Sequence, residues 1–184
     1  MRPHKIEPYR SVFDAIAGPG CPLCRYMRNY QAKCVQASLD PRPKGICNFH
    51  AWAIAAIHDR LDASQVFLNL LSSASLGGTM DCDICLRLAK EDGTQLRLVS
   101  ASFKTLSTVH WLNTYGEICI PHSIELRKQV SLVHTPVIDR AVARYRDKLI
   151  RSLQEQQGVD IEGAGWGVLG HAAEFLAGQR GLYR

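Results

Sequence analysis

The pattern of apolar and polar positions along the chain predicts helices throughout and contains few signs of strands. The clearest element is a long amphipathic helix over residues 136–157. Its apolar stripe repeats every four residues and consists of Val137, Ala141, Tyr145, Leu149 and Leu153. Basic residues occupy the other faces of this helix, and we expect them to form a solvated surface. The chain is therefore predicted to be all-α, a helical bundle with a long C-terminal amphipathic helix.

Glycine and proline residues divide the rest of the chain into shorter predicted helices. Gly18, Pro19 and Gly20 end a short element, and the stretch DPRPKG over residues 40–45 ends the helix that follows. The helix after that break is apolar on most of its surface, so we expect it to be buried. Gly93 either divides the stretch over residues 79–116 into two helices or lies within one continuous helix. These helices are expected at residues 9–17, 22–39, 48–61, 64–76, 79–116, 121–133 and 168–178.

Composition and charge place the chain among ordinary globular proteins. Of its 184 residues, 46% are hydrophobic and 21% are charged, which suits one core-forming domain over residues 1–184. The net charge of +5 is mild and not concentrated, so nucleic-acid binding is not expected. No apolar run reaches the roughly 18 residues of a membrane span, and the N-terminal stretch lacks the apolar region of a secretory signal. We therefore expect a cytoplasmic protein with reduced thiols and no membrane contact.

Four short pairs of cysteine and histidine residues carry the candidate chemistry. Cys21 and Cys24 form a Cys-x2-Cys pair, and a Cys-x2-His pair, Cys47 and His50, follows after 22 residues. The second half of the chain repeats this order, with 33 residues between its two pairs. The eight residues are Cys21, Cys24, Cys47, His50, Cys82, Cys85, Cys119 and His122. The seventh cysteine, Cys34, lies outside the motif, and we expect it to fill the core.

The repeated order of the pairs indicates that the chain contains two versions of one metal-binding helical unit. We place the first repeat at about residues 10–76, the second at about 79–134, and a C-terminal helical segment at about 135–184. The two spacings differ by 11 residues, close to three helical turns. An insertion of that length can lengthen a helix without rotating its face.

The residue types of each set point to a metal or a cluster. Three thiolates and one imidazole are a common closed tetrahedral zinc set. The same four groups can hold an iron–sulfur cluster, because thiolates are its usual ligands and histidine replaces them occasionally. We expect two zinc ions, with two iron–sulfur clusters as the alternative.

The simplest assignment completes each site within one half of the chain, so that Cys47 and His50 join Cys21 and Cys24. An antiparallel helical hairpin sets a condition on this assignment, because successive helix starts then lie at opposite ends. Either the linker brings the chain back, a return that the DPRPKG stretch could provide, or the first pair lies on a loop. Pairing across the two halves is also geometrically possible.

Several motif segments give the chain a specific likeness. CPLC, GICNFHAW, CDIC and GEICIPH, with the closing AAEFLAGQRG, resemble an uncharacterised bacterial family of cysteine-rich helical proteins labelled as a domain of unknown function. The resemblance spans nearly the whole chain and implies that the eight paired residues act together as ligands of a metal or cluster. It implies no activity or substrate.

The function expected from these features is structural rather than catalytic. No arrangement of residues typical of catalysis stands out, so enzymatic activity is not expected. We expect two structural zinc sites in a module that binds a partner protein, or self-associates, through the 136–157 helix. The alternative is an iron–sulfur protein that transfers electrons or senses oxidants. The role of His171, in the last predicted helix, is left open.

Overall fold

The structure, a computed structural model, describes residues 12–37, 45–57, 64, 67–68, 71–72, 82–156 and 167–178. Over these residues the chain forms helices and no strand, which confirms the all-α prediction. The helix expected at 64–76 lies largely outside the described residues, as does the DPRPKG stretch. The elements are η1 (Asp14–Ala17), α1 (Pro22–Ala37), α2 (Asn48–Ile57), α4 (Asp83–Ser102), α5 (Leu106–Thr114), α6 (Ile120–Gln129), η2 (Leu132–His134), α7 (Thr135–Gln156) and α8 (Gly167–Ala177).

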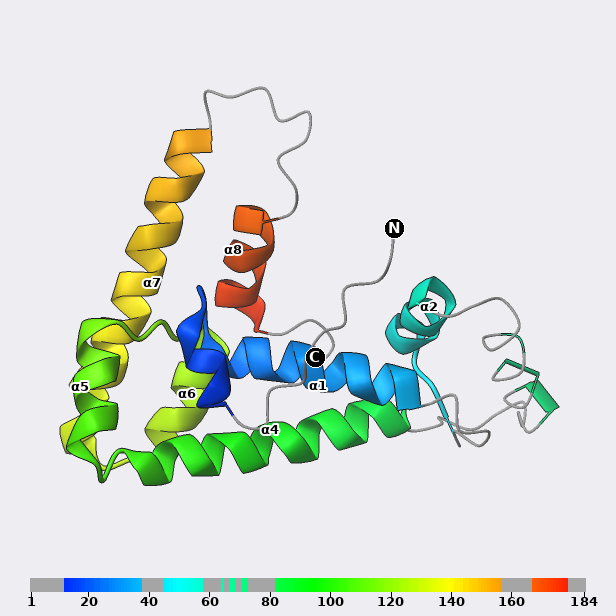
Figure 1. Ribbon diagram of the computed structural model, residues 1–184, viewed down its shortest axis with the longest axis horizontal. Helices are drawn as coiled ribbons and strands as arrows, with labels where there is room; N and C mark the ends of the chain where they lie inside the picture. The colour runs from blue at the N-terminus through cyan, green and yellow to red at the C-terminus, as the bar shows by residue number, and fades with distance from the viewer. Residues whose placement is uncertain are drawn as a thin grey trace.

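Helices α1 and α4 lie side by side and run in opposite directions (Figure 1). Each of the two helices has a buried apolar face. The buried side chains include Leu23 and Met27 on α1 and Leu88 and Leu96 on α4. Because the two helices are antiparallel, the start of α1 lies near α6 and the start of α4 lies near α2 (Figure 1). The pair of helices therefore has two ends. At one end α6 begins beside the start of α1, and at the other α2 begins beside the start of α4.

The C-terminal part of the fold is built around α7, which packs against α5, α6 and α8. Its buried side chains are Val137, Ile138, Ala141, Tyr145 and Leu149. One of its basic residues is not on a solvated face as expected. Arg144 is half-buried and donates hydrogen bonds to the carbonyl oxygens of Leu112 and Asn113, in the last turn of α5, and of Gly116, just beyond that helix.

The structure decides between the two alternatives at Gly93 and corrects the expectation of a buried helix. Helix α4 runs through Gly93, and the chain bends only at residues 103–105, before α5. At 20 residues, α4 is only slightly longer than α1 with 16, so most of the extra length of the second half forms the 9-residue α5. The helix expected to be buried is α2, yet Trp52 on it is 72% exposed, because α2 packs against α1 on one side.

Candidate metal centres

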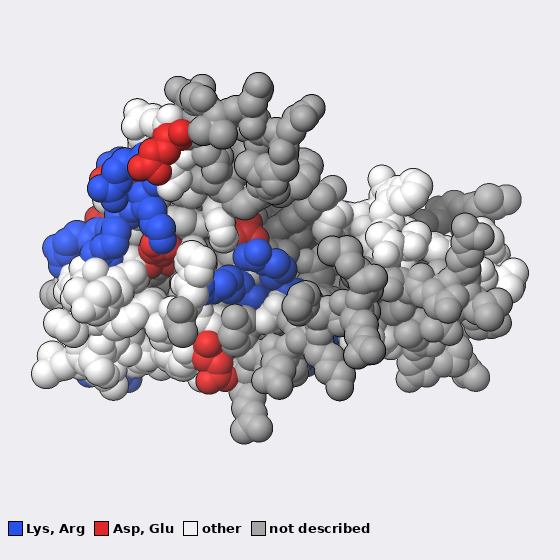
Figure 2. Space-filling model, turned by 45° about the horizontal axis from the view of Figure 1, so that its top comes forward, with Lys and Arg blue, Asp and Glu red and all other residues white. Residues whose placement is uncertain are grey.

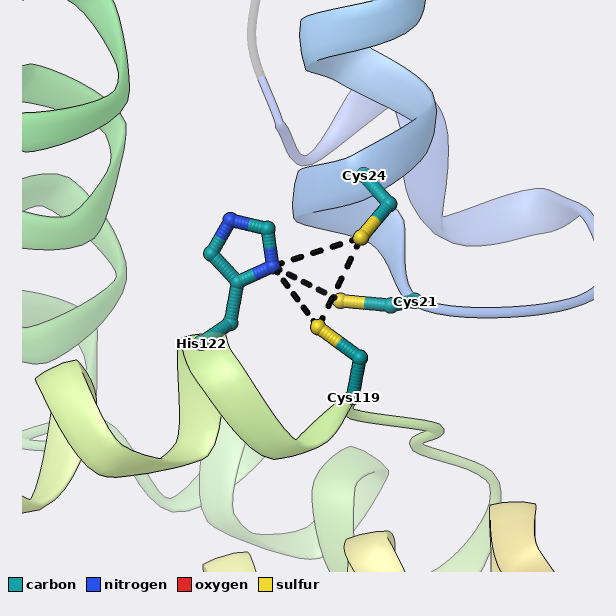
Figure 3. A group of neighbouring side chains, drawn as sticks. All are labelled: Cys21, Cys24, Cys119 and His122. Carbon is teal, nitrogen blue, oxygen red and sulfur yellow. Dashed lines mark hydrogen bonds between the residues drawn. The ribbon is translucent and has the colours of Figure 1, made fainter. Parts of the chain in front are cut away.

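The structure gathers the eight predicted residues into two groups of four. We call the first the inner cluster; it consists of Cys21, Cys24, Cys119 and His122. We call the second the outer cluster; it consists of Cys47, His50, Cys82 and Cys85. Within each cluster the four possible ligand atoms lie within 4.8 Å of one another, which is compatible with metal binding. Figure 3 shows the inner cluster between the starts of α1 and α6.

This grouping overturns the assignment of each site to one half of the chain. Each cluster takes its Cys-x2-Cys pair from one half and its Cys-x2-His pair from the other. The reason is the length and direction of α1 and α4. A 16-residue helix is about 24 Å long, so a pair at the start of α2, beyond the end of α1, lies far from Cys21. The antiparallel α4 begins at that far end and supplies the missing cysteines.

All four pairs adopt the same local structure at a helix N-terminus. The first cysteine of each pair immediately precedes its helix, and its carbonyl oxygen accepts a hydrogen bond from the backbone N–H four residues later, at 2.9–3.1 Å. The second residue lies one turn away on the same face, which is why a spacing of two intervening residues suits a shared ion. Helix N-termini carry partial positive charge, so this position also stabilises thiolates. The donors of these bonds are Arg25, Ala51, Leu86 and Ser123.

The distances within the inner cluster suit a single tetrahedral ion. The Nδ1 atom of His122 lies 3.0 Å from the sulfur of Cys119, 3.4 Å from that of Cys24 and 3.5 Å from that of Cys21. The sulfurs of Cys24 and Cys119 are 3.5 Å apart. Zinc with bonds of about 2.3 Å to sulfur and about 2.0 Å to nitrogen would separate its ligands by about 3.5–3.8 Å. The four ligand atoms would have to move apart only slightly to bind a zinc ion.

The outer cluster repeats this geometry. The Nδ1 atom of His50 lies 3.3 Å from the sulfur of Cys47 and 3.4 Å from those of Cys82 and Cys85. The sulfurs of Cys47 and Cys85 are 3.7 Å apart. In both clusters the histidine thus presents the same ring nitrogen to three sulfurs, and the donor set is the same.

Each histidine has a further partner on its other ring nitrogen. His122 Nε2 lies 3.0 Å from the carboxylate of Asp92, and His50 Nε2 lies 3.2 Å from the side-chain amide of Gln31. Both partners are at least nine-tenths buried. When Nδ1 binds a metal, Nε2 carries a proton and donates it to such an acceptor, which fixes the ring orientation. The structure places the amide nitrogen of Gln31 nearest to His50 Nε2. A flip of the amide group puts its oxygen there instead, where it accepts the proton.

Asp92 and Gln31 were missed by the sequence reasoning, although a signal for them exists. Gln31 follows Cys24 by seven residues, and Asp92 follows Cys85 by seven residues. Two helical turns from its own cysteines, each residue reaches the histidine of the other cluster. The matched position on both Cys-x2-Cys helices is visible once the two halves are aligned on their cysteines.

Burial and the neighbouring thiols shift the pKa values of the cluster cysteines in different directions. A hydrogen bond with Cys119 and one with Cys21, together with burial, raise the pKa of Cys24 well above its usual value. Burial, with the neighbouring sulfurs, raises the pKa of Cys85 to about 12. Although burial opposes ionisation of Cys21, hydrogen bonds with Cys119 and Cys24 and the charge of His122 lower the pKa of Cys21. A cation bound between the sulfurs would favour the ionised form of the thiols whose pKa is raised.

The remaining candidate residues lie outside both clusters. Cys34 is buried at 5% exposure in α1, as expected for a cysteine that fills the core. His171 on α8 is half-buried, with its Nδ1 atom 3.4 Å from the hydroxyl of Tyr145 and 3.9 Å from the carboxylate of Glu174. His171 therefore belongs to the packing of α8 against α7.

A comparison of the chain with protein-family models, with curated proteins and with solved structures finds no match. The family that the motif segments resemble is thus not identified by these comparisons. Among the helices that the structure describes, none combines the length and the hydropathy that a membrane crossing requires.

Proposed function

We propose that the protein is a helical module held together by two zinc ions, one in each cluster, and that it acts by binding another protein. The observation that carries the zinc proposal is the compactness of the clusters, whose four ligand atoms lie within 4.8 Å of one another. A single tetrahedral ion needs that spacing. The ligands of an iron–sulfur cluster must instead reach several irons bridged by sulfide, which favours a wider arrangement.

The same geometry supports a structural role for the ions. Four protein ligands close the coordination sphere of zinc and leave no open position for a substrate. A structural zinc site contributes on the order of 10 kcal/mol or more, as much as the whole net stability of many domains. Because each cluster joins helix starts from both halves of the chain, each ion would act as a cross-link between them. We infer that this interlocked arrangement arose by duplication of one unit, since the four pairs and the two buried histidine partners occupy matched positions.

The proposed interaction role is supported by the exposed surface. Trp52 on α2 is 72% exposed, and Leu132 and Val133 beside the start of α7 are 87% and 75% exposed. Tryptophan in particular is enriched among the residues that contribute most to binding in protein interfaces. Because the apolar stripe of α7 is buried within the chain, this helix would meet a partner through its charged faces. Figure 2 shows basic and acidic side chains interleaved there.

The zinc proposal is tested by purifying the protein without oxygen, recording its absorption spectrum and measuring its metal and sulfide content. We expect a colourless protein with about two zinc ions per chain. Replacement of zinc by Co2+ should give the intense visible bands of a tetrahedral thiolate site. Cys34→Ser is the matched control and should keep both ions, because Cys34 belongs to neither cluster. A brown protein that contains iron and sulfide would contradict the proposal and support the iron–sulfur alternative.

A further inference from the structure

We propose that Cys47 and Cys85 of the outer cluster form a site of oxidative modification, at which a peroxide joins the two sulfurs in a disulfide and the zinc ion is released. This inference rests on the proposed function, since it takes each cluster to hold a zinc ion. It assigns to the outer cluster a response that the inner cluster lacks.

The first observation is the unequal access of solvent to two similar pairs of sulfurs. In the inner cluster, Cys24 and Cys119 are 3.5 Å apart, and both are fully buried at 0% exposure. In the outer cluster, Cys47 and Cys85 are 3.7 Å apart, and both are only partly buried. Oxidation of a thiolate depends on its access to the oxidant as well as on its charge. With the ligand types and spacing nearly equal, access distinguishes the two pairs.

The second observation is the position of each cluster in the fold. The inner cluster lies in the body of the bundle, where Asp92 of α4 contacts His122 and Tyr145 of α7 lies close to Gly20, next to Cys21. The outer cluster joins the start of α4 to α2, which packs against α1. A backbone hydrogen bond of 3.3 Å from Asp83 to Gly45 adds to this junction. Loss of the outer ion therefore loosens α2 without opening the core.

The chemistry balances with hydrogen peroxide as the oxidant. One thiolate attacks the peroxide, a sulfur–oxygen bond forms, the oxygen–oxygen bond breaks and hydroxide leaves. The second thiolate attacks the resulting sulfenic acid, the sulfur–sulfur bond forms and a second hydroxide leaves. The two sulfurs supply the two electrons that reduce the peroxide. The sulfurs approach from 3.7 Å to about 2.05 Å, and zinc, left with Cys82 and His50, dissociates as Zn2+.

The experiment treats the zinc-loaded protein with a small excess of hydrogen peroxide. Zinc release is followed with a chromophoric chelator, and disulfides are mapped by mass spectrometry at each time point. We expect one ion per chain to leave first, at least about tenfold faster than the second, together with a Cys47–Cys85 disulfide. Cys24 and Cys119 should remain reduced in that phase, the helical circular dichroism should be largely kept, and a thiol reductant with added zinc should restore the ion. The variant Cys34→Ser should behave in the same way, which excludes a role for the cysteine outside the clusters.

Three results would overturn the inference. Both ions could leave at the same rate, the first disulfide could form in the inner cluster, or the first ion could leave with Cys47 and Cys85 still reduced. Metal analysis before the oxidant is added separates this failure from that of the proposed function. A protein that contains two zinc ions but loses the inner one first contradicts only the inference. A protein without zinc contradicts both.

Discussion

The inner and outer clusters have the same types of ligand but different surroundings. Each contains three cysteines and a histidine at the starts of two helices, and each histidine turns Nδ1 toward the sulfurs. The inner cluster is buried on all sides, with a carboxylate on its histidine. The outer cluster is partly open, with a neutral amide in the corresponding place. The ligands set which ion can bind, whereas the surroundings decide how tightly it is held and how readily it is attacked.

The largest expected difference between the clusters concerns removal of a ligand. Cys119→Ser should cost the inner ion and abolish cooperative unfolding, because the contribution of a structural zinc is comparable with the whole net stability of a domain. Cys47→Ser should cost the outer ion but leave a folded protein with a lower melting temperature. The outer cluster holds α2, which packs against α1, whereas the inner cluster holds α6, which packs against α4, α7 and α8. Circular dichroism during heating, with zinc analysis of each variant, checks this order. Equal losses of stability in the two variants would contradict the expectation that the inner cluster stabilises the fold more than the outer cluster does.

A smaller effect is expected from the buried partners of the histidines. Asp92→Ala leaves the Nε2–H group of His122 without its acceptor, so the zinc affinity of the inner cluster should fall about 10–100-fold. Gln31→Ala should weaken the outer cluster less, because a neutral acceptor stabilises the bound imidazole less than a carboxylate does. Titration against a competing chelator measures both affinities. Lys90→Ala, an exposed change on the same helix as Asp92, is the control and should leave both unchanged. If Asp92→Ala also leaves both unchanged, Asp92 does not support the inner site.

The smallest of these effects tests the glycine that precedes the inner cluster. Gly20 has φ of +84°, and a Cβ atom there would lie 2.9 Å from the hydroxyl oxygen of Tyr145. Gly20→Ala should therefore lower the free energy of unfolding by about 1–2 kcal/mol. Gly93→Ala is the matched control, because its Cβ would meet only Arg97 at 3.6 Å within a helix, and it should raise stability by about 0.5–1 kcal/mol. Urea denaturation compares the two, and equal stability would show that the backbone before Cys21 is not constrained.

Much of the fold and the membership of the candidate site could be predicted from local patterns. Apolar periodicity and glycine or proline breaks are local signals, and they located most of the described helices. The break at residues 103–105, between α4 and α5, contains neither glycine nor proline and was missed. The order of the cysteine and histidine pairs identified the eight residues that the structure brings together. The lack of a long apolar run agrees with the finding that none of the described helices is long and apolar enough to cross a membrane.

The pairing of the clusters could not be predicted, because it depends on how the helices pack. Which Cys-x2-His pair completes the site of Cys21 follows from the antiparallel packing of α1 against α4, a contact between residues far apart in the sequence. Asp92 and Gln31 were missed for the same reason, since each follows the cysteines of one cluster on its helix and contacts the histidine of the other cluster. Arg144 looked like a solvated residue because its acceptors are backbone carbonyls at the end of α5 and just beyond it, and backbone groups are the same for every residue type.

The most direct test of the account is the zinc content of two double variants. Cys47→Ser with Cys85→Ser removes two ligands from one cluster, and the account predicts that one zinc ion per chain remains. Cys24→Ser with Cys47→Ser removes one ligand from each cluster, and the account predicts that nearly all zinc is lost. If each site were completed within one half of the chain, the two results would be exchanged. That exchange would contradict the central claim that the two halves are joined by shared metal sites.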